Sequence, residues 1–134
     1  MINLGIGYEI KGWERVKNIR HNKFKLYVID LERKKEISVY TPNIKEGMQI
    51  LKIVIDALYE YNKESENKLY IEEILFIEPS YAEELIGEEI CPMWHIYLSN
   101  KKKQYLILKP TIESKEEVLN ILKNKSYCIL EFSF

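Results

Sequence analysis

The stretch TPNIKEGMQILKIVIDALYEYNK, residues 41–63, carries the strongest helix pattern in the chain. Its apolar residues recur at spacings of three and four and so share one stripe: Ile44, Met48, Leu51, Ile55 and Leu58. Further apolar residues widen that stripe, which predicts a helix packed across a sheet. Asn43 is a suitable N-cap with Glu46 three residues later, as in a capping box. Gly47 is unfavourable inside a helix and indicates a close approach of the backbone to a strand.

The residues before this helix predict a β-hairpin. KFKLYVID, from Lys23, alternates apolar and polar side chains, and EISVY places Ile37 and Val39 on one face. The polar LERKK between them is typical of a turn. We therefore expect antiparallel strands at 23–29 and 36–40.

The rest of the chain predicts four more strands and a second helix. The helix is SKEEVLNILKNK, in which Ser114 and Glu117 have the spacing of a capping box. SYAEELIGEE is expected to be a short helical turn or an acidic loop. The predicted strands lie within LYIEEILFIEP, MWHIYLS, QYLILKP and YCILEFSF, residues 69–79, 93–99, 104–110 and 127–134.

The resulting order is β-β-α-β-β-β-α-β. Strands that cluster instead of alternating with helices favour an α+β fold. We expect a single, mostly antiparallel sheet with the long helix packed on one face. The length of 134 residues suits one domain, 1–134.

Composition excludes several broad classes of function. Apolar residues make up 46% and charged residues 31%, as in ordinary globular proteins. The 20 basic and 21 acidic residues nearly cancel, so no general attraction to nucleic acid is expected. No apolar run approaches the roughly 20 residues of a membrane span. Without a signal-peptide pattern, the chain as written is expected to be cytoplasmic, or extracytoplasmic if it is a fragment of an anchored protein.

The stretch CPMWHIYLSN, residues 91–100, brings together residue types that hold metals or act as nucleophiles. Its alternation predicts a strand, in which Cys91 and His95 would lie about 13 Å apart. That separation is too large for a shared metal ion or a nucleophile and its base. GIGYEIKG lacks the glycine spacing of a phosphate-binding loop. We therefore expect no catalytic residue, no metal and no cofactor. Cys91 and Cys128 are interpreted as small buried apolar groups, and the sequence leaves open whether they form a disulfide.

The ten tyrosines are the feature that most favours a binding function. Tyrosine combines a large contact area with a polar tip and is enriched at protein interfaces. Several tyrosines alternate with apolar strand residues, so they would line any sheet face that helices leave uncovered. If both faces are covered, they are edges of the core instead. Residues 72–89 add seven glutamates without Lys or Arg. The candidate protein-binding residues are Tyr27, Tyr40, Tyr97, Tyr105, Glu83, Glu84, Glu88 and Glu89.

One family resemblance covers about half the chain, from Asn43 to Ile112. Here a helix is followed by three strands, and Pro92 stands two residues before Trp94 at the start of a β-hairpin. This resembles the PepSY-like modules, including those of YycI-type regulators of bacterial histidine kinases. The chain departs from that pattern in lacking a membrane anchor and the small residues expected at the end of the hairpin. The resemblance implies a non-catalytic module that docks on another protein.

Three functions follow as hypotheses. The first is a non-enzymatic, regulatory protein-binding module of the PepSY-like kind. The second is a cytoplasmic immunity or inhibitor protein that neutralises a toxin by direct binding. The third is an enzyme whose site the sequence does not reveal. The expected partner is another protein, with no nucleic acid and no membrane span.

Overall fold

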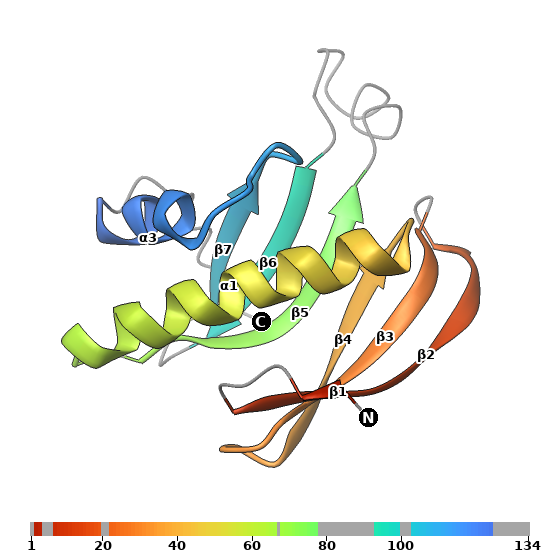
Figure 1. Cartoon of the computed structure of the whole chain (residues 1–134), viewed down its shortest axis with the longest axis horizontal. Coiled ribbons are helices and arrows are strands. Elements are labelled where there is room, and N and C mark those ends of the chain that lie inside the picture. Colours follow the sequence, from red (N-terminus) through yellow and green to blue (C-terminus); the bar gives the residue numbers. More distant parts are fainter. Residues whose placement is uncertain are drawn as a thin grey trace.

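The computed structural model describes residues 2–3, 7–19, 22–66, 68–77, 93–99 and 103–124 (Figure 1). These residues form one seven-stranded sheet with two helices, which confirms the α+β fold class. The strands lie side by side in chain order, and every neighbouring pair is antiparallel except β4 and β5. The elements are β1 (Ile2–Asn3), β2 (Tyr8–Ile19), β3 (Asn22–Asp30), β4 (Lys35–Thr41), α1 (Ile44–Glu64), β5 (Tyr70–Ile77), β6 (Met93–Ser99), β7 (Lys103–Leu108) and α3 (Lys115–Lys123).

The long helix α1 connects the one parallel pair of strands and crosses one face of the sheet, as predicted (Figure 1). Its apolar stripe is buried through Leu51, Val54 and Ile55. Helix α3 lies beside α1 and adds Val118 and Leu122 to the same core. Both described helices therefore cover the same face of the sheet, and the hydrophobic core lies between them and the strands.

The start of α1 confirms the predicted cap and the reason for the glycine. Asn43 Oδ1 accepts hydrogen bonds from the backbone N–H groups of Lys45 and Glu46. The N–H of Asn43 donates to Thr41 Oγ1 at 3.2 Å, in place of the bond from Glu46 that a full capping box requires. A Cβ on Gly47 would lie 2.7 Å from Thr41 Cγ2, so the helix approaches the end of β4 too closely for a larger residue.

The N-terminal strands β1 and β2 are a correction to the predicted element order, which began at the hairpin of β3 and β4. Strand β2 pairs with β3 along most of its length, but the register shifts between Ile10 and Gly12. Ile10 faces the core, and the next side chain on that side is Trp13, opposite Leu26. The bulge breaks the two-residue period by which a strand is recognised.

The other predicted elements are confirmed where the structure describes them. The strands β3, β4, β5, β6 and β7 and the helix α3 overlap the predicted segments. Ser114 caps α3, and Glu117 accepts hydrogen bonds from the Ser114 hydroxyl and from the N–H of Glu113. The predicted turn or loop at 80–89 and the predicted strand at 127–134 lie outside the described residues.

Neither described helix combines the length and the hydropathy needed to cross a membrane.

Candidate functional site

The predicted tyrosines on β3, β4 and β6 lie on the sheet face that points away from α1 and α3. On β3, Leu26 and Val28 are buried beneath the helices while Tyr27 between them points to the other side. The same alternation turns Tyr40 and Tyr97 outward, and all three side chains are half-buried. We call this side of the sheet the tyrosine face. No helix among the described residues covers it (Figure 1).

Strand register assembles residues that are far apart in sequence into one row across this face. Tyr27 pairs with Ser38, which pairs with Glu73 across the parallel junction of β4 and β5. Glu73 on β5 pairs with Tyr97 on β6, and Tyr97 pairs in turn with Tyr105 on β7. The row therefore joins β3, β4, β5, β6 and β7. Two predicted tyrosines, 70 residues apart in the chain, lie only three strands apart on one surface.

A neighbouring row on the same face is more apolar. It runs from Lys25 through Tyr40, Leu75 and His95 to Ile107. Leu75 is only 5% exposed, yet it lies outside the main core cluster under the helices. The face thus has an apolar centre beside a row of polar and aromatic side chains, which is the composition of a protein interface.

Local contacts hold the β3 part of the tyrosine face in place. The Lys25 ammonium lies 4.7 Å from the ring centroid of Tyr27 and 5.8 Å from that of Tyr40. The Tyr27 hydroxyl donates a hydrogen bond to Glu14 on β2. This bond raises the pKa of Tyr27 to about 12. Rings fixed in this way lose little conformational entropy when a partner binds.

Acidic side chains outnumber basic ones on the described part of the tyrosine face. By strand alternation, Glu9, Glu14, Glu36 and Glu73 lie on this side, against Lys23 and Lys25. This excess favours a partner with a basic surface.

The remaining candidates from the sequence are four glutamates, Tyr105 and the two cysteines. Glu83, Glu84, Glu88 and Glu89 lie outside the described residues, as do Cys91 and Cys128, so their predicted roles stay predictions. Tyr105 lies on β7 and pairs with Tyr97 on β6.

The stretch CPMWHIYLSN forms strand β6 from Met93 to Ser99, as its alternation predicts. Trp94 and Ile96 are buried under the helices, and Phe76 packs edge-on against Trp94 with 4.9 Å between ring centroids. His95 and Tyr97 point to the tyrosine face. Within the described part of the chain, no three His, Cys, Asp or Glu side chains are grouped so as to hold a metal ion.

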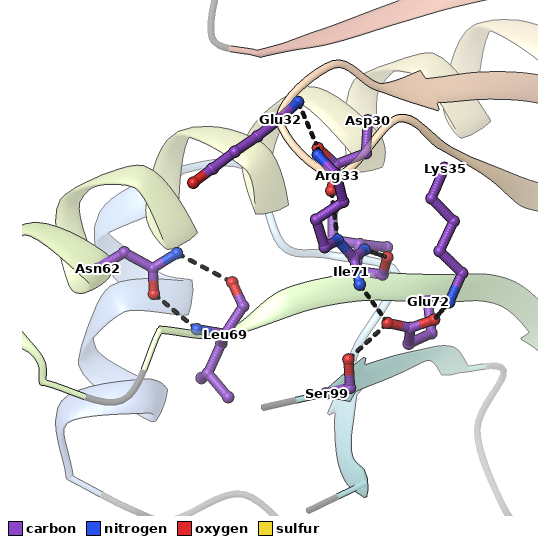
Figure 2. A network of polar contacts seen from close by, with 9 residues as sticks. All are labelled: Asp30, Glu32, Arg33, Lys35, Asn62, Leu69, Ile71, Glu72 and Ser99. Carbon is purple, nitrogen blue, oxygen red and sulfur yellow. Dashed lines mark hydrogen bonds and ion pairs between the residues drawn. The ribbon is translucent and has the colours of Figure 1, made fainter. Parts of the chain in front are cut away.

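A polar network that sequence reasoning missed joins the β3–β4 turn to β5 and β6 (Figure 2). Arg33 Nε donates to Asp30 Oδ2 at 2.7 Å, and Arg33 Nη2 donates to the carbonyl of Ile71 at 2.8 Å. Glu72 binds the second terminal nitrogen of Arg33 and also the Lys35 ammonium. The Ser99 hydroxyl donates to the same carboxylate. We call these contacts the Arg33 network.

A bulge in β5 creates the position that the Arg33 network uses. The register with β6 shifts between Ile71 and Glu73, so Glu72 is the extra residue. Strands β4 and β5 pair only from Ser38 and Glu73 onward, and they diverge before that point (Figure 1). Arg33 bridges these diverging ends, so the network holds the two halves of the sheet together.

Burial and hydrogen bonding act in opposite directions on Glu72. Partial burial would raise its pKa, but hydrogen bonds from Lys35, Ser99 and Arg33 outweigh it and lower the pKa to about 2. Asp30 is only 2% exposed, and its Oδ1 also accepts the N–H groups of Glu32 and Arg33. An Asp that closes a turn through its own side chain is a recognisable sequence feature, and DLERKK contains it. The distant partner Glu72 has no comparable sign.

The chain matches no known protein family, and neither a characterised protein nor a solved structure matches it.

Proposed function

We propose that this chain is a non-enzymatic, protein-binding module whose partner docks on the tyrosine face. The observation that supports the proposal is the row of Tyr27, Ser38, Glu73 and Tyr97, gathered from four strands on a face that no described helix covers. Large aromatic side chains with polar tips are the usual anchors of protein interfaces. The half-buried state of these residues fits a surface that still has area to bury.

The partner is a protein with a basic contact surface. The glutamates of the tyrosine face would meet lysine or arginine side chains, and the tyrosine rings would accept guanidinium groups by cation–π contact. Such complementarity accelerates association more than it strengthens the final complex. Regulation of the partner, as in the PepSY-like modules, is the first role that this surface would serve.

The second candidate is an inhibitor that neutralises a toxin. The acidic excess on the tyrosine face favours it, because a toxin that acts on nucleic acid must present a basic surface. Covering that surface with an acidic and aromatic one would block it without any catalytic residue. The two roles use the same face and differ in what the partner does.

The test is to measure binding to the purified products of the neighbouring genes by titration calorimetry. A partner that binds the wild-type chain should bind Tyr27→Ala and Tyr97→Ala at least about tenfold more weakly. Trp13→Ala is the matched control, because Trp13 is 54% exposed but lies on the helix side of the sheet. A partner weakened by Trp13→Ala and unaffected by both tyrosine variants would contradict the proposal.

The association rate with the same partner tests the role of the glutamates on the tyrosine face. Glu14→Gln combined with Glu73→Gln should slow association and flatten its dependence on salt, because two charges of the docking face are removed. Glu64→Gln, an exposed site at the end of α1, should leave the association rate unchanged. Equal salt dependence in the double variant and the wild type would exclude a basic partner surface.

A further inference from the structure

A pocket of about 330 Å³ lies on the helix side of the sheet, away from the tyrosine face. It is bounded by the second half of α1, the beginning of β2, the β3–β4 turn and the residues that lead into β5. Its volume is at the lower end of the range that small-molecule sites occupy. Among the residues that the structure describes, the lining consists of Gly7, Tyr8, Asp30, Glu32, Ile55, Leu58, Tyr59, Asn62, Lys63, Lys68 and Tyr70. We call it the Tyr8 pocket.

The interior of the Tyr8 pocket is apolar and aromatic. Ile55 and Leu58 contribute side chains that also belong to the core. The ring of Tyr70 is stacked against the Arg33 guanidinium, whose central carbon lies 4.6 Å from the ring centroid. The Lys63 ammonium lies over the ring of Tyr59, 4.3 Å from the ring centroid. An apolar side chain of a ligand would therefore enter a site whose walls are already positioned.

Two polar residues of the lining, Asp30 and Asn62, already form an ion pair or hydrogen bonds within the protein. The Asp30 carboxylate is neutralised by Arg33. The Asn62 amide donates to the carbonyl of Leu69 at 2.9 Å and accepts its N–H at 2.8 Å (Figure 2). These contacts fix the boundary of the pocket and leave ligand recognition to other groups.

The remaining charges lie on separate elements and have opposite signs. Glu32 comes from the β3–β4 turn, and its side chain extends toward the side of α1 that carries Asn62 (Figure 2). Lys63 comes from the last turn of α1, and Lys68 from the segment before β5. Neither lysine forms an ion pair with another residue in the described ranges, and Glu60, one turn before Lys63, is bound by Lys115.

From this arrangement we propose that the Tyr8 pocket binds a zwitterionic small molecule of the amino-acid class with an apolar or aromatic side chain. The carboxylate of the ligand lies between Lys63 and Lys68, and its ammonium lies at Glu32. The side chain lies over Ile55 and Leu58, between the tyrosine rings.

Tyr8 is a further polar residue of the lining. Burial, reinforced by the negative charge of Asp30, raises the pKa of Tyr8 to about 12, although the Arg33 charge and a hydrogen bond with the Ile71 backbone act in the opposite direction.

Ligand binding in the Tyr8 pocket and protein binding on the tyrosine face are independent of each other. The lining of the Tyr8 pocket contains none of the residues named above for the tyrosine face. Loss of protein binding would leave the pocket intact, and an empty pocket would leave the tyrosine face intact.

The experiment is a titration of the full chain with L-phenylalanine and L-leucine, followed through the backbone amide resonances by NMR. We expect saturable shifts at the lining residues with a dissociation constant at or below about 1 mM. L-phenylalaninamide lacks the carboxylate and N-acetyl-L-phenylalanine lacks the ammonium, so each should bind roughly tenfold more weakly. Absence of saturable shifts with both amino acids would overturn the proposal. Equal binding of either analogue would overturn the zwitterion assignment.

Variants test which residues hold the ligand. Lys63→Met combined with Lys68→Met should abolish the preference for L-phenylalanine over its amide, and Glu32→Gln should abolish the preference over the N-acetyl compound. Lys45→Met and Glu116→Gln are the controls, because both sites are exposed and outside the pocket. All of these sites are at the surface, so the variants should fold. Preferences that persist in the pocket variants, or that disappear in the controls, would contradict the assignment.

Discussion

The two faces of the sheet use the same strands for different purposes. Under the helices, the strands present fully buried aliphatic side chains such as Leu26, Val39 and Ile96. One residue further along β3, β4 and β6, the side chains of Tyr27, Tyr40 and Tyr97 lie on the tyrosine face. Residues for stability and residues for recognition are therefore neighbours along each strand, because successive side chains point to opposite faces.

Side chains on the two faces of the sheet also differ in how much they contribute to the free energy of folding. A side chain under the helices contributes to folding through burial and close packing, so its truncation leaves a cavity. A half-buried side chain on the tyrosine face, such as Tyr27 or Tyr97, keeps part of its surface in water, so its truncation should cost folding less. Variants that remove neighbouring side chains of one strand therefore test the assignment of each face.

The largest effect is expected at the centre of the helix side. Leu26→Ala should lower the free energy of unfolding by about 2–5 kcal/mol, because the cavity beneath α1 cannot collapse fully. Urea denaturation measures the change. The matched control is Lys25→Ala on the same strand, which faces the other side and should cost less than about 1 kcal/mol. Equal losses at the two positions would contradict the assignment of the faces.

The next effect is expected where the two halves of the sheet are joined by the Arg33 network. Arg33→Ala removes the partner of the nearly inaccessible Asp30 carboxylate and should destabilise the protein by about 2–4 kcal/mol. Adding Asp30→Asn to this variant should recover part of the loss, since no buried charge remains without a partner. Thermal unfolding of the single and double variants measures the coupling. Strictly additive losses would show that the pair does not act as a unit.

A smaller effect is expected where α1 meets β4. Alanine favours a helix over glycine by about 1 kcal/mol, but the added Cβ of Gly47→Ala would collide with the buried Thr41. We expect a net destabilisation of about 1–2 kcal/mol. Gln49→Ala, at an exposed site of the same helix, should stay within about 0.5 kcal/mol of the wild type. A stabilised Gly47→Ala protein would show that the helix can move away from the strand.

The pH dependence of stability should report on Glu72. Its pKa in the folded protein, about 2, is below the ordinary value of 4.5, so its stabilising contribution is present above about pH 4.5. The contribution is lost as the pH falls from about 4.5 through about 2, where the carboxylate becomes protonated. Unfolding followed across this range should therefore show a steeper loss in the wild type than in Glu72→Gln. Parallel curves would contradict the role of Glu72 in the Arg33 network.

Much of the fold follows from local patterns in the sequence. The hairpin of β3 and β4 shows in the alternation of KFKLYVID and EISVY, and α1 shows in a stripe that begins after the cap at Asn43. Strand β2 is not recognisable from the sequence pattern. The bulge at Lys11 means that the side chain after Ile10 on the helix side of the sheet is Trp13 and not residue 12. A period of two fails there for a reason that only the paired strand reveals.

The sequence predicts which side of its own strand each tyrosine of the candidate site faces, but not how the tyrosines of different strands are arranged. Alternation alone indicates that Tyr27 and Tyr97 oppose the apolar side of their own strands. Their placement in one row depends on the register across the parallel junction of β4 and β5, which no local pattern encodes. The Arg33 network was missed for the same reason, since Arg33 and Glu72 are 39 residues apart and meet only through the bulge in β5.

The most direct test of the two-faced sheet compares Ile96→Ala with Tyr97→Ala, neighbours on β6 that point to opposite sides. Both variants are measured by urea denaturation and by binding to the identified partner. We predict that Ile96→Ala loses about 2–5 kcal/mol of folding free energy, whereas Tyr97→Ala loses at most about 1 kcal/mol and binds at least about tenfold more weakly. A Tyr97→Ala protein that unfolds as readily as Ile96→Ala, or that binds with unchanged affinity, would contradict the account.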